Sequence, residues 1–242
     1  NASGALAFNG GALQVTGTDF TSTDRAVSVG ANGGTIDISA ADHTFTLTQD
    51  IAGTGPATKS GAGTLVLAGS SPHDWTISAG TLVSDVERFL GDAEIGAGAT
   101  LVFDQPDDEV AYGGMLSGAG RLVKKGQGTL ELVGNHTYSG GTVLQEGRLE
   151  VARDGYLGSG DLTFEGGTLW VRGTQFSSTG RAIHWSDQGG GFHINNAANT
   201  FTVSQALTGA GDLTKMGDGT LVLTGANDYG DTRVRAGRLI GN

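Results

Sequence analysis

The chain repeats itself along its length, and this repetition limits the possible folds more than any other feature. Residues 10–69 align without a gap onto residues 166–225, an offset of 156, and about half of the aligned positions are identical. A third, partial copy lies between them, because LSGAGRLVKKGQGTLELVG at 116–134 matches LTGAGDLTKMGDGTLVLTG at 207–225. Such self-similarity is typical of solenoids. We therefore interpret residues 1–242 as a single solenoid of related modules, at about 10–80, 93–147 and 166–237.

A shorter repeat runs inside these modules, with a step of 17 to 20 residues. Leucines recur at this step in two series: Leu65, Leu82 and Leu101, then Leu130, Leu149 and Leu169. Leu130 and Leu132 flank Glu131. Alternation with period two places the two leucines on one face of a β-strand and the middle residue on the other. Because the middle residue is a glutamate, we expect the leucine face to be buried.

Composition agrees with many short strands joined by tight turns, since the chain has 44 glycines and only 3 prolines. Alternation alone would also suit an antiparallel sandwich or barrel, but a regular coil length favours a solenoid. No sustained 3.6-residue period supports a helical one. We predict an all-β fold, a right-handed parallel β-helix (β-solenoid), with Gly80, Gly147 and Gly237 at its corners. Because the sequence begins and ends inside patterned sequence, we expect a fragment of a longer rod.

Charge and hydropathy exclude two classes of partner. The 14 basic and 25 acidic residues give a net charge of −11. Such a surface repels phosphate backbones, so we expect no nucleic acid partner. No apolar run approaches the roughly 20 residues of a membrane helix, so we expect no membrane insertion by this segment.

The patterns of common catalytic, metal and cofactor sites are missing. There is no G-x-S-x-G elbow and no H-E-x-x-H, and the chain has no cysteine. Glycine pairs such as Gly61 and Gly63 lack the third glycine of a dinucleotide fingerprint. We predict no catalytic residues, no metal and no cofactor, and hence no enzyme. A carbohydrate-cleaving β-helix ranks last among the alternatives, because it needs paired carboxylates and the acidic residues here are scattered in the sequence.

Several polar positions recur between modules. Three histidines align with other polar residues: His43 with Asn199, His184 with Ser28, and His193 with Asp37. This exchange predicts outward-facing side chains. Three lysines recur at the start of each signature: Lys59, Lys124 and Lys215. A polar residue that caps a turn explains them.

Trp170 is the aromatic residue of most interest for function. It aligns with Gln14, whereas Trp185 aligns with Val29 and is expected in the core. If Gln14 faces solvent, so does Trp170, and an outward tryptophan costs hydration free energy unless something covers it. The sequence therefore yields three candidate surface contacts: Trp170, His184 and His193.

Three segments carry a family resemblance: KSGAGTLVLAG at 59–69, KKGQGTLELVG at 124–134 and KMGDGTLVLTG at 215–225. The middle copy continues as NHTYSGGTVLQEGRLEV at 135–151, whereas the first departs with SPHDWTISAGTL. The pattern resembles the passenger-associated strand repeat of bacterial autotransporters (type V secretion). The resemblance implies an exported passenger at the cell surface of a Gram-negative bacterium or secreted from it. It also implies a covalently linked outer-membrane barrel outside this segment.

Two function hypotheses follow. In the first, the outer faces of the β-helix act in adhesion or self-association, as in aggregation and biofilm. Its partners would be a second copy, side by side, or components of host or neighbouring cell surfaces. Many weak polar contacts along such a surface would sum to useful avidity. In the alternative, the segment is an inert β-helical stalk that displays a separate catalytic or toxin domain.

Overall fold

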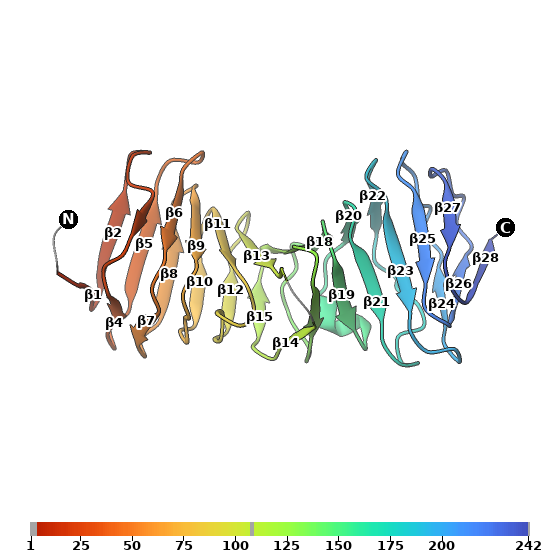
Figure 1. Ribbon diagram of the computed structural model, residues 1–242, viewed down its shortest axis with the longest axis horizontal. Helices are drawn as coiled ribbons and strands as arrows, with labels where there is room; N and C mark the ends of the chain where they lie inside the picture. The colour runs from red at the N-terminus through yellow and green to blue at the C-terminus, as the bar shows by residue number, and fades with distance from the viewer. Residues whose placement is uncertain (1–3, 107–108, 242) are drawn as a thin grey trace. The chain divides into compact units, whose positions relative to one another are not determined.

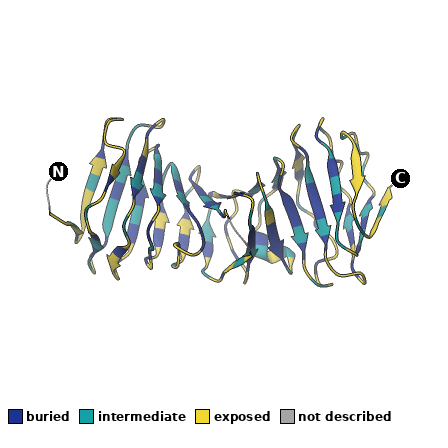
Figure 2. Ribbon diagram, in the orientation of Figure 1, coloured by how far each residue is buried: buried dark blue, intermediate teal, exposed yellow. Residues whose placement is uncertain are grey.

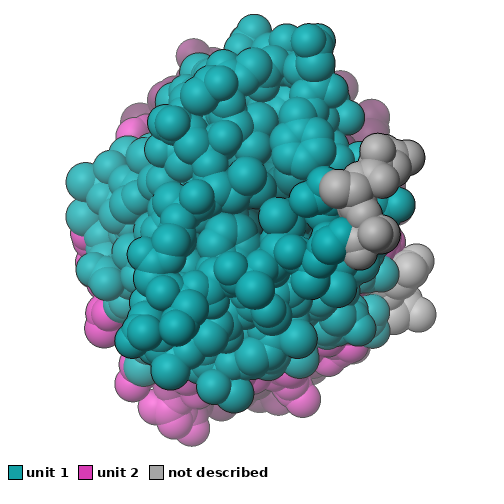
Figure 3. Space-filling view, turned by 90° about the vertical axis from the view of Figure 1, so that its left-hand side faces the viewer, with its two compact units in different colours: residues 1–104, 114–122 teal, residues 105–113, 123–242 magenta. Residues whose placement is uncertain are grey.

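The computed structural model describes residues 4–106 and 109–241, and strands dominate it (Figure 1). The paired strands run parallel and form a β-solenoid, so the predicted fold class is confirmed. The described part of the chain contains one short 3-10 helix, η1 (Asp154–Leu157), and no α-helix. The chain divides into two compact units, coloured separately in Figure 3. Unit 1 comprises Asn1–Asp104 and Gly114–Leu122, and unit 2 comprises Gln105–Gly113 and Val123–Asn242.

Unit 1 is built from three parallel sheets, each formed by one strand per coil. The first runs in the order β1 (Leu6–Phe8), β4 (Val27–Val29), β7 (Ile51–Gly53). The second runs β2 (Gly11–Val15), β5 (Gly34–Ile38), β8 (Ala57–Ser60), β10 (Trp75–Ile77), β12 (Ala93–Ile95), β15 (Leu116–Gly118). The third runs β3 (Ser22–Thr23), β6 (Thr44–Leu47), β9 (Thr64–Leu67), β11 (Thr81–Ser84), β13 (Thr100–Asp104). The chain thus climbs one strand spacing per coil.

Unit 2 has the same construction. Its largest sheet runs β14 (Val110–Tyr112), β17 (Thr129–Leu132), β19 (Arg148–Val151), β21 (Thr168–Val171), β23 (Gly190–Ile194), β25 (Leu213–Met216), β27 (Thr232–Val234). A second runs β18 (Thr142–Leu144), β20 (Leu162–Phe164), β22 (Ile183–Trp185), and a third runs β24 (Thr200–Val203), β26 (Thr220–Leu223), β28 (Arg238–Gly241). Within β16 (Arg121–Lys125), unit 1 ends at Leu122 and unit 2 continues from Val123.

The leucine series lie in register on neighbouring strands, as the short repeat predicts. Leu82 pairs with Leu65 and Leu101 in unit 1, and Leu149 pairs with Leu130 and Leu169 in unit 2. All six side chains are buried. Figure 2 shows the alternation of buried and less buried residues along the strands. Stacking identical side chains at one strand spacing therefore builds the core of each unit.

The corner glycines are required for two reasons. Gly80, Gly147 and Gly237 have φ values of 68°, 61° and 66°, which disfavour any residue with a Cβ. A Cβ at Gly147 would also lie 2.4 Å from the carbonyl oxygens of Gly126 and Gly128 in the preceding coil. The same 2.4 Å approach recurs at the other two corners. The glycine spacing of the signature thus reflects coils that touch through their backbones.

The recurring lysines cap turns, as predicted, but they do so from inside the solenoid. Lys59, Lys124 and Lys215 are 0% exposed. The ammonium group of Lys124 donates to the carbonyls of Lys125 and Gly126 at 2.6 Å each and of Glu146 at 3.3 Å. Lys59 and Lys215 make the equivalent three bonds. Each lysine therefore ties the turn of its own coil to the turn of the next, just before the corner glycine.

The prediction that the exchanged histidines face outward is wrong for His43. This side chain is buried, and its Nε2 lies 2.9 Å from the carbonyl oxygen of Phe20. Asn199 is also buried and donates to the equivalent carbonyl, that of Phe176, at 3.1 Å. The position accepts either residue because both side chains can donate a hydrogen bond to the equivalent backbone carbonyl. Two histidines without an aligned partner, His73 and His136, are buried as well.

Candidate functional site

Trp170 lies on the outward face of β21. Its neighbours Leu169 and Val171 are fully buried, whereas Trp170 is half-buried, and the equivalent Gln14 is exposed. The predicted orientation is therefore confirmed. Trp185 is 5% exposed and lies in the core, also as predicted.

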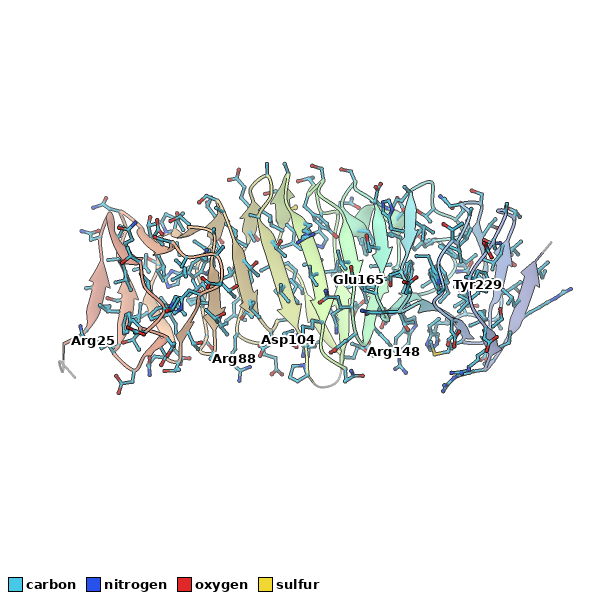
Figure 4. The ribbon with its side chains drawn as sticks, turned by 90° about the horizontal axis from the view of Figure 1, so that it is seen from above. Arg25, Arg88, Asp104, Arg148, Glu165 and Tyr229 are labelled. Atoms are coloured by element: carbon cyan, nitrogen blue, oxygen red, sulfur yellow. The ribbon has the colours of Figure 1, made fainter. Side chains whose placement is uncertain are left out.

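The structure brings Trp170 and His193 together. They pair in register between β21 and β23, and their rings stack with centroids 4.4 Å apart and planes 7° from parallel. On β19, which flanks β21 on the other side, Arg148 places its guanidinium carbon 5.5 Å from the Trp170 ring centroid. Figure 4 labels Arg148 at the outer side of its coil. The chain itself thus covers the outward indole, with an imidazole on one face and a cation on the other.

Some polar atoms of this cluster have no partner among the described residues. Trp170 Nε1 and His193 Nδ1 are shielded from solvent and make no hydrogen bond there. Burial, together with nearby Arg148 and Lys215, lowers the pKa of His193, so the imidazole is neutral at pH 7. Unpaired buried polar atoms lower stability, so folding stability alone does not explain why these side chains are present.

His184 lies apart from the other two candidates. It is exposed on β22, in a different sheet from β21 and β23, and its Nε2 is 2.9 Å from Asp161 Oδ2. The fold therefore joins two of the three candidate contacts into one cluster and leaves the third on another face.

Sequence reasoning missed a cluster of carboxylates beside Trp170. Glu131 and Glu150 pair in register on β17 and β19, and Glu150 pairs with Trp170. Arg172 bridges the two carboxylates, with its Nη1 2.5 Å from Glu131 Oε1 and its Nε 3.3 Å from Glu150 Oε1. Residues scattered in the sequence are thus adjacent in the fold, because each coil adds one outward position to the same row.

The carboxylates differ in environment. Burial, reinforced by the charges of Glu109 and Glu131, raises the pKa of Glu150 to about 7, although Arg172 opposes the shift. A glycosidase requires two carboxyl groups that both reach the substrate. The Glu150 side chain is only 3% exposed, and Arg172 holds both groups. We therefore do not assign a hydrolytic role to the pair. Among the described residues no group of three or more His, Cys, Asp or Glu side chains is placed to hold a metal ion.

Replacing Glu150 with glutamine is expected to stabilise the chain at pH 8 and to change little at pH 4. Because the folded pKa of about 7 lies above the ordinary value of 4.5, folding favours the protonated acid. Its contribution is fully present below pH 4.5 and is lost as the pH rises through 7. A neutral glutamine avoids that loss, which is on the order of 1–3 kcal/mol. Urea unfolding at both pH values measures the difference.

The matched control is Glu131→Gln, which breaks a partly exposed ion pair and should destabilise by about 0.2–1 kcal/mol at pH 8. Parent and variant are compared at the same pH because His136 changes the stability of both with pH, in the direction opposite to Glu150. Burial lowers its pKa to about 4, so it destabilises the fold as the pH falls from 6.5. A Glu150→Gln variant as stable as the parent at pH 8 would contradict the prediction.

Comparison with known proteins identifies the repeated unit. The passenger-associated-transport-repeat family matches the chain three times, at residues 58–83, 122–151 and 213–240. Each match contains one of the buried lysines together with the corner glycine that follows it. These three segments are passenger-associated-transport repeats of the kind that autotransporter passenger domains carry. The resemblance read from the sequence is therefore confirmed, and the interlocked turns are the structural basis of the repeat.

One curated relative of the passenger is the adhesin BmaC autotransporter of Brucella suis biovar 1 (strain 1330). It is 37% identical over 128 residues, which cover 51% of this chain and 4% of the relative. The passenger chain thus spans a small part of the length of that protein. No solved structure matches the chain.

The family fixes the compartment. Passengers of autotransporters are at the cell surface of Gram-negative bacteria or are secreted from them, and this segment shares that location. None of the helices formed by the described residues has the length and apolar character needed to span a membrane.

Proposed function

We propose that this passenger segment is a non-catalytic adhesive element. Its contact surface is the outward face of β17, β19, β21, β23 and β25, centred on Trp170 and His193. The adhesin name of the Brucella relative supports an adhesive role. The partners are a second copy, bound side by side, or components of host or neighbouring cell surfaces. An outer-membrane barrel, covalently linked beyond this segment, would hold the passenger at the cell.

The observation that carries the proposal is the contrast between repeated modules. Val171 is buried, as is its counterpart Val15. On the outward face, by contrast, the register pair Trp170 and His193 replaces the register pair Gln14 and Asp37. The core is kept while the surface changes, and the change introduces an aromatic stack with unpaired polar atoms. A surface that varies on a constant scaffold is expected of a binding face.

One observation favours the rival stalk function. Arg148 and His193 cover both faces of Trp170, so a ligand that stacks on the indole would have to displace one of them. In that case the cluster only protects an outward tryptophan, and the segment positions other parts of the protein.

The test is a surface swap between modules. The double variant Trp170→Gln, His193→Asp copies the pair found at Gln14 and Asp37. In the full-length passenger displayed on bacteria, we expect at least a fivefold loss of either cell–cell settling or attachment to host cells. Settling reports self-association and attachment reports a foreign partner. Thermal unfolding of the purified segment should change by less than about 1 kcal/mol, because the substitutions are on the surface.

The control is Gln14→Ala, which alters the equivalent outward position of the other module and should leave both assays unchanged. Settling and attachment that both persist in a stable double variant would exclude this contact surface and favour the stalk. Equal losses in the control would indicate a general surface effect and would also contradict the proposal.

A further inference from the structure

A groove in unit 2 lies beside the Trp170 cluster and crosses the strands of the largest sheet. Its volume is about 370 Å³. Glycines form part of its lining where side chains would otherwise fill the space: Gly147, Gly166 and Gly190. Arg148 lies near one end, next to the coil of Gln127, and Arg235 lies at the other. The groove therefore runs across successive coils and has a guanidinium group near each end.

Neither arginine is engaged by a carboxylate, so both can pair with an external anion. Each is exposed, and neither guanidinium has a carboxylate partner in residues 4–106 and 109–241. This contrasts with Arg172, Arg181 and Arg88, which all pair with carboxylates. The chain has 25 acidic and 14 basic residues, so its net charge is negative. Two arginines without carboxylate partners nevertheless make the potential in this groove locally positive.

The spacing of the arginines selects a linear ligand. Arg148 is on β19, and Arg235 directly follows β27, four strands away in the same sheet. Four spacings of about 4.8 Å separate the two backbone positions by about 19 Å. One carboxylate or sulfate group cannot contact both guanidinium groups across that distance. A polymer with repeated acidic groups can lie along the groove and contact both.

The remaining lining favours a polysaccharide over a peptide. Thr168 and Thr214 line the groove between the arginines, and their hydroxyl groups can exchange hydrogen bonds with sugar hydroxyls. The groove lies on the face of the sheet, where strand pairing already uses the backbone groups, so a peptide cannot bind by adding a strand. Single-stranded nucleic acid needs free aromatic faces, and those of Trp170 are covered.

We infer that this groove binds a linear acidic polysaccharide, whose carboxylate or sulfate groups pair with Arg148 and Arg235. The inference rests on the proposed adhesive function and gives that function a ligand class. Guanidinium groups suit both anions because their paired N–H donors match two acceptor oxygens. Sugar hydroxyls between the acidic groups would contact the two threonines.

Binding of the purified 242-residue segment is measured at low salt against four polymers. The acidic polysaccharides are dextran sulfate and polygalacturonate, neutral dextran is the uncharged control, and polyglutamate is the acidic peptide control. We expect binding to at least one acidic polysaccharide and at least tenfold weaker binding to dextran and polyglutamate. The preferred polymer shows whether sulfate or carboxylate is recognised. Binding to neither acidic polysaccharide, or equal binding to polyglutamate, would overturn the inference.

Two variants locate the site. Arg148→Gln and Arg235→Gln should each weaken binding at least roughly tenfold, the loss expected for one charge-assisted hydrogen bond. Arg235 does not touch Trp170, so its effect is independent of the aromatic stack. Arg238→Gln makes the same charge change one turn further along the coil, outside the groove lining, and should have less than a twofold effect. Equal losses in all three variants would reveal nonspecific attraction and refute the site.

The result is separable from the adhesion test. If neither polysaccharide binds but the Trp170→Gln, His193→Asp variant loses adhesion, the ligand class is wrong and the adhesive function stands. If a polysaccharide binds through both arginines while the double variant adheres normally, the groove stands and the proposed contact centre at Trp170 is wrong.

Discussion

Replacing Leu130 with aspartate is expected to destabilise the passenger segment by at least about 4 kcal/mol. The side chain is 0% exposed and pairs in register with the half-buried Val110 on one side and the buried Leu149 on the other. A carboxylate there would lose its hydration without gaining a counter-ion, and the neighbouring coils would lose the apolar surface on which they stack. Urea unfolding followed by circular dichroism measures the loss, and a chain that no longer folds agrees with the prediction.

The control lies one residue away. Glu131→Ser removes an outward side chain and its ion pair with Arg172, so we expect a loss of less than about 1 kcal/mol. The large difference between neighbouring positions is the signature of a strand with one buried face. Similar losses at both positions would mean that the faces are assigned wrongly.

Replacing Lys124 with methionine is expected to destabilise the segment by about 2–4 kcal/mol. Methionine keeps much of the length and apolar volume of the side chain but cannot donate to the carbonyls of Lys125, Gly126 and Glu146. Leaving buried acceptors without a donor costs more than the hydrogen bonds themselves are worth on balance. Because the lysine links two coils, we also expect the amide protons of the turn before Gly147 to exchange with solvent faster in the variant than in the parent.

Lys125→Met provides the matched control, because the neighbouring lysine is exposed. Even with the loss of an exposed surface interaction, it should change the free energy of unfolding by less than about 1 kcal/mol. A Lys124→Met variant as stable as this control would show that the buried ammonium does not support the turns. Lys215 makes the equivalent three bonds, so Lys215→Met should change the free energy of unfolding in the same way as Lys124→Met.

Comparing single aligned residues between the modules predicted part of the candidate site. The alignment of Trp170 with Gln14 predicted an outward tryptophan, and the strand register confirms it. The same reasoning failed for His43, because exchange between two polar residues does not reveal which side of the strand they occupy. There the backbone carbonyl of Phe20, which accepts from the buried side chain, decides the orientation, and this partner cannot be read from the sequence.

The sequence by itself determined the architecture and the repeated unit. Periodic leucines, corner glycines and recurring lysines are local signals, and each coil repeats the same local problem, so a short pattern suffices to define the solenoid. Only the tertiary structure decided which outward residues become neighbours. Glu150, Trp170 and His193 are 20 and 23 residues apart along the chain, yet they occupy adjacent strands. Their contacts depend on coil length and register, which single-residue patterns do not specify. The groove between Arg148 and Arg235 arises in the same way, because it is a product of stacking.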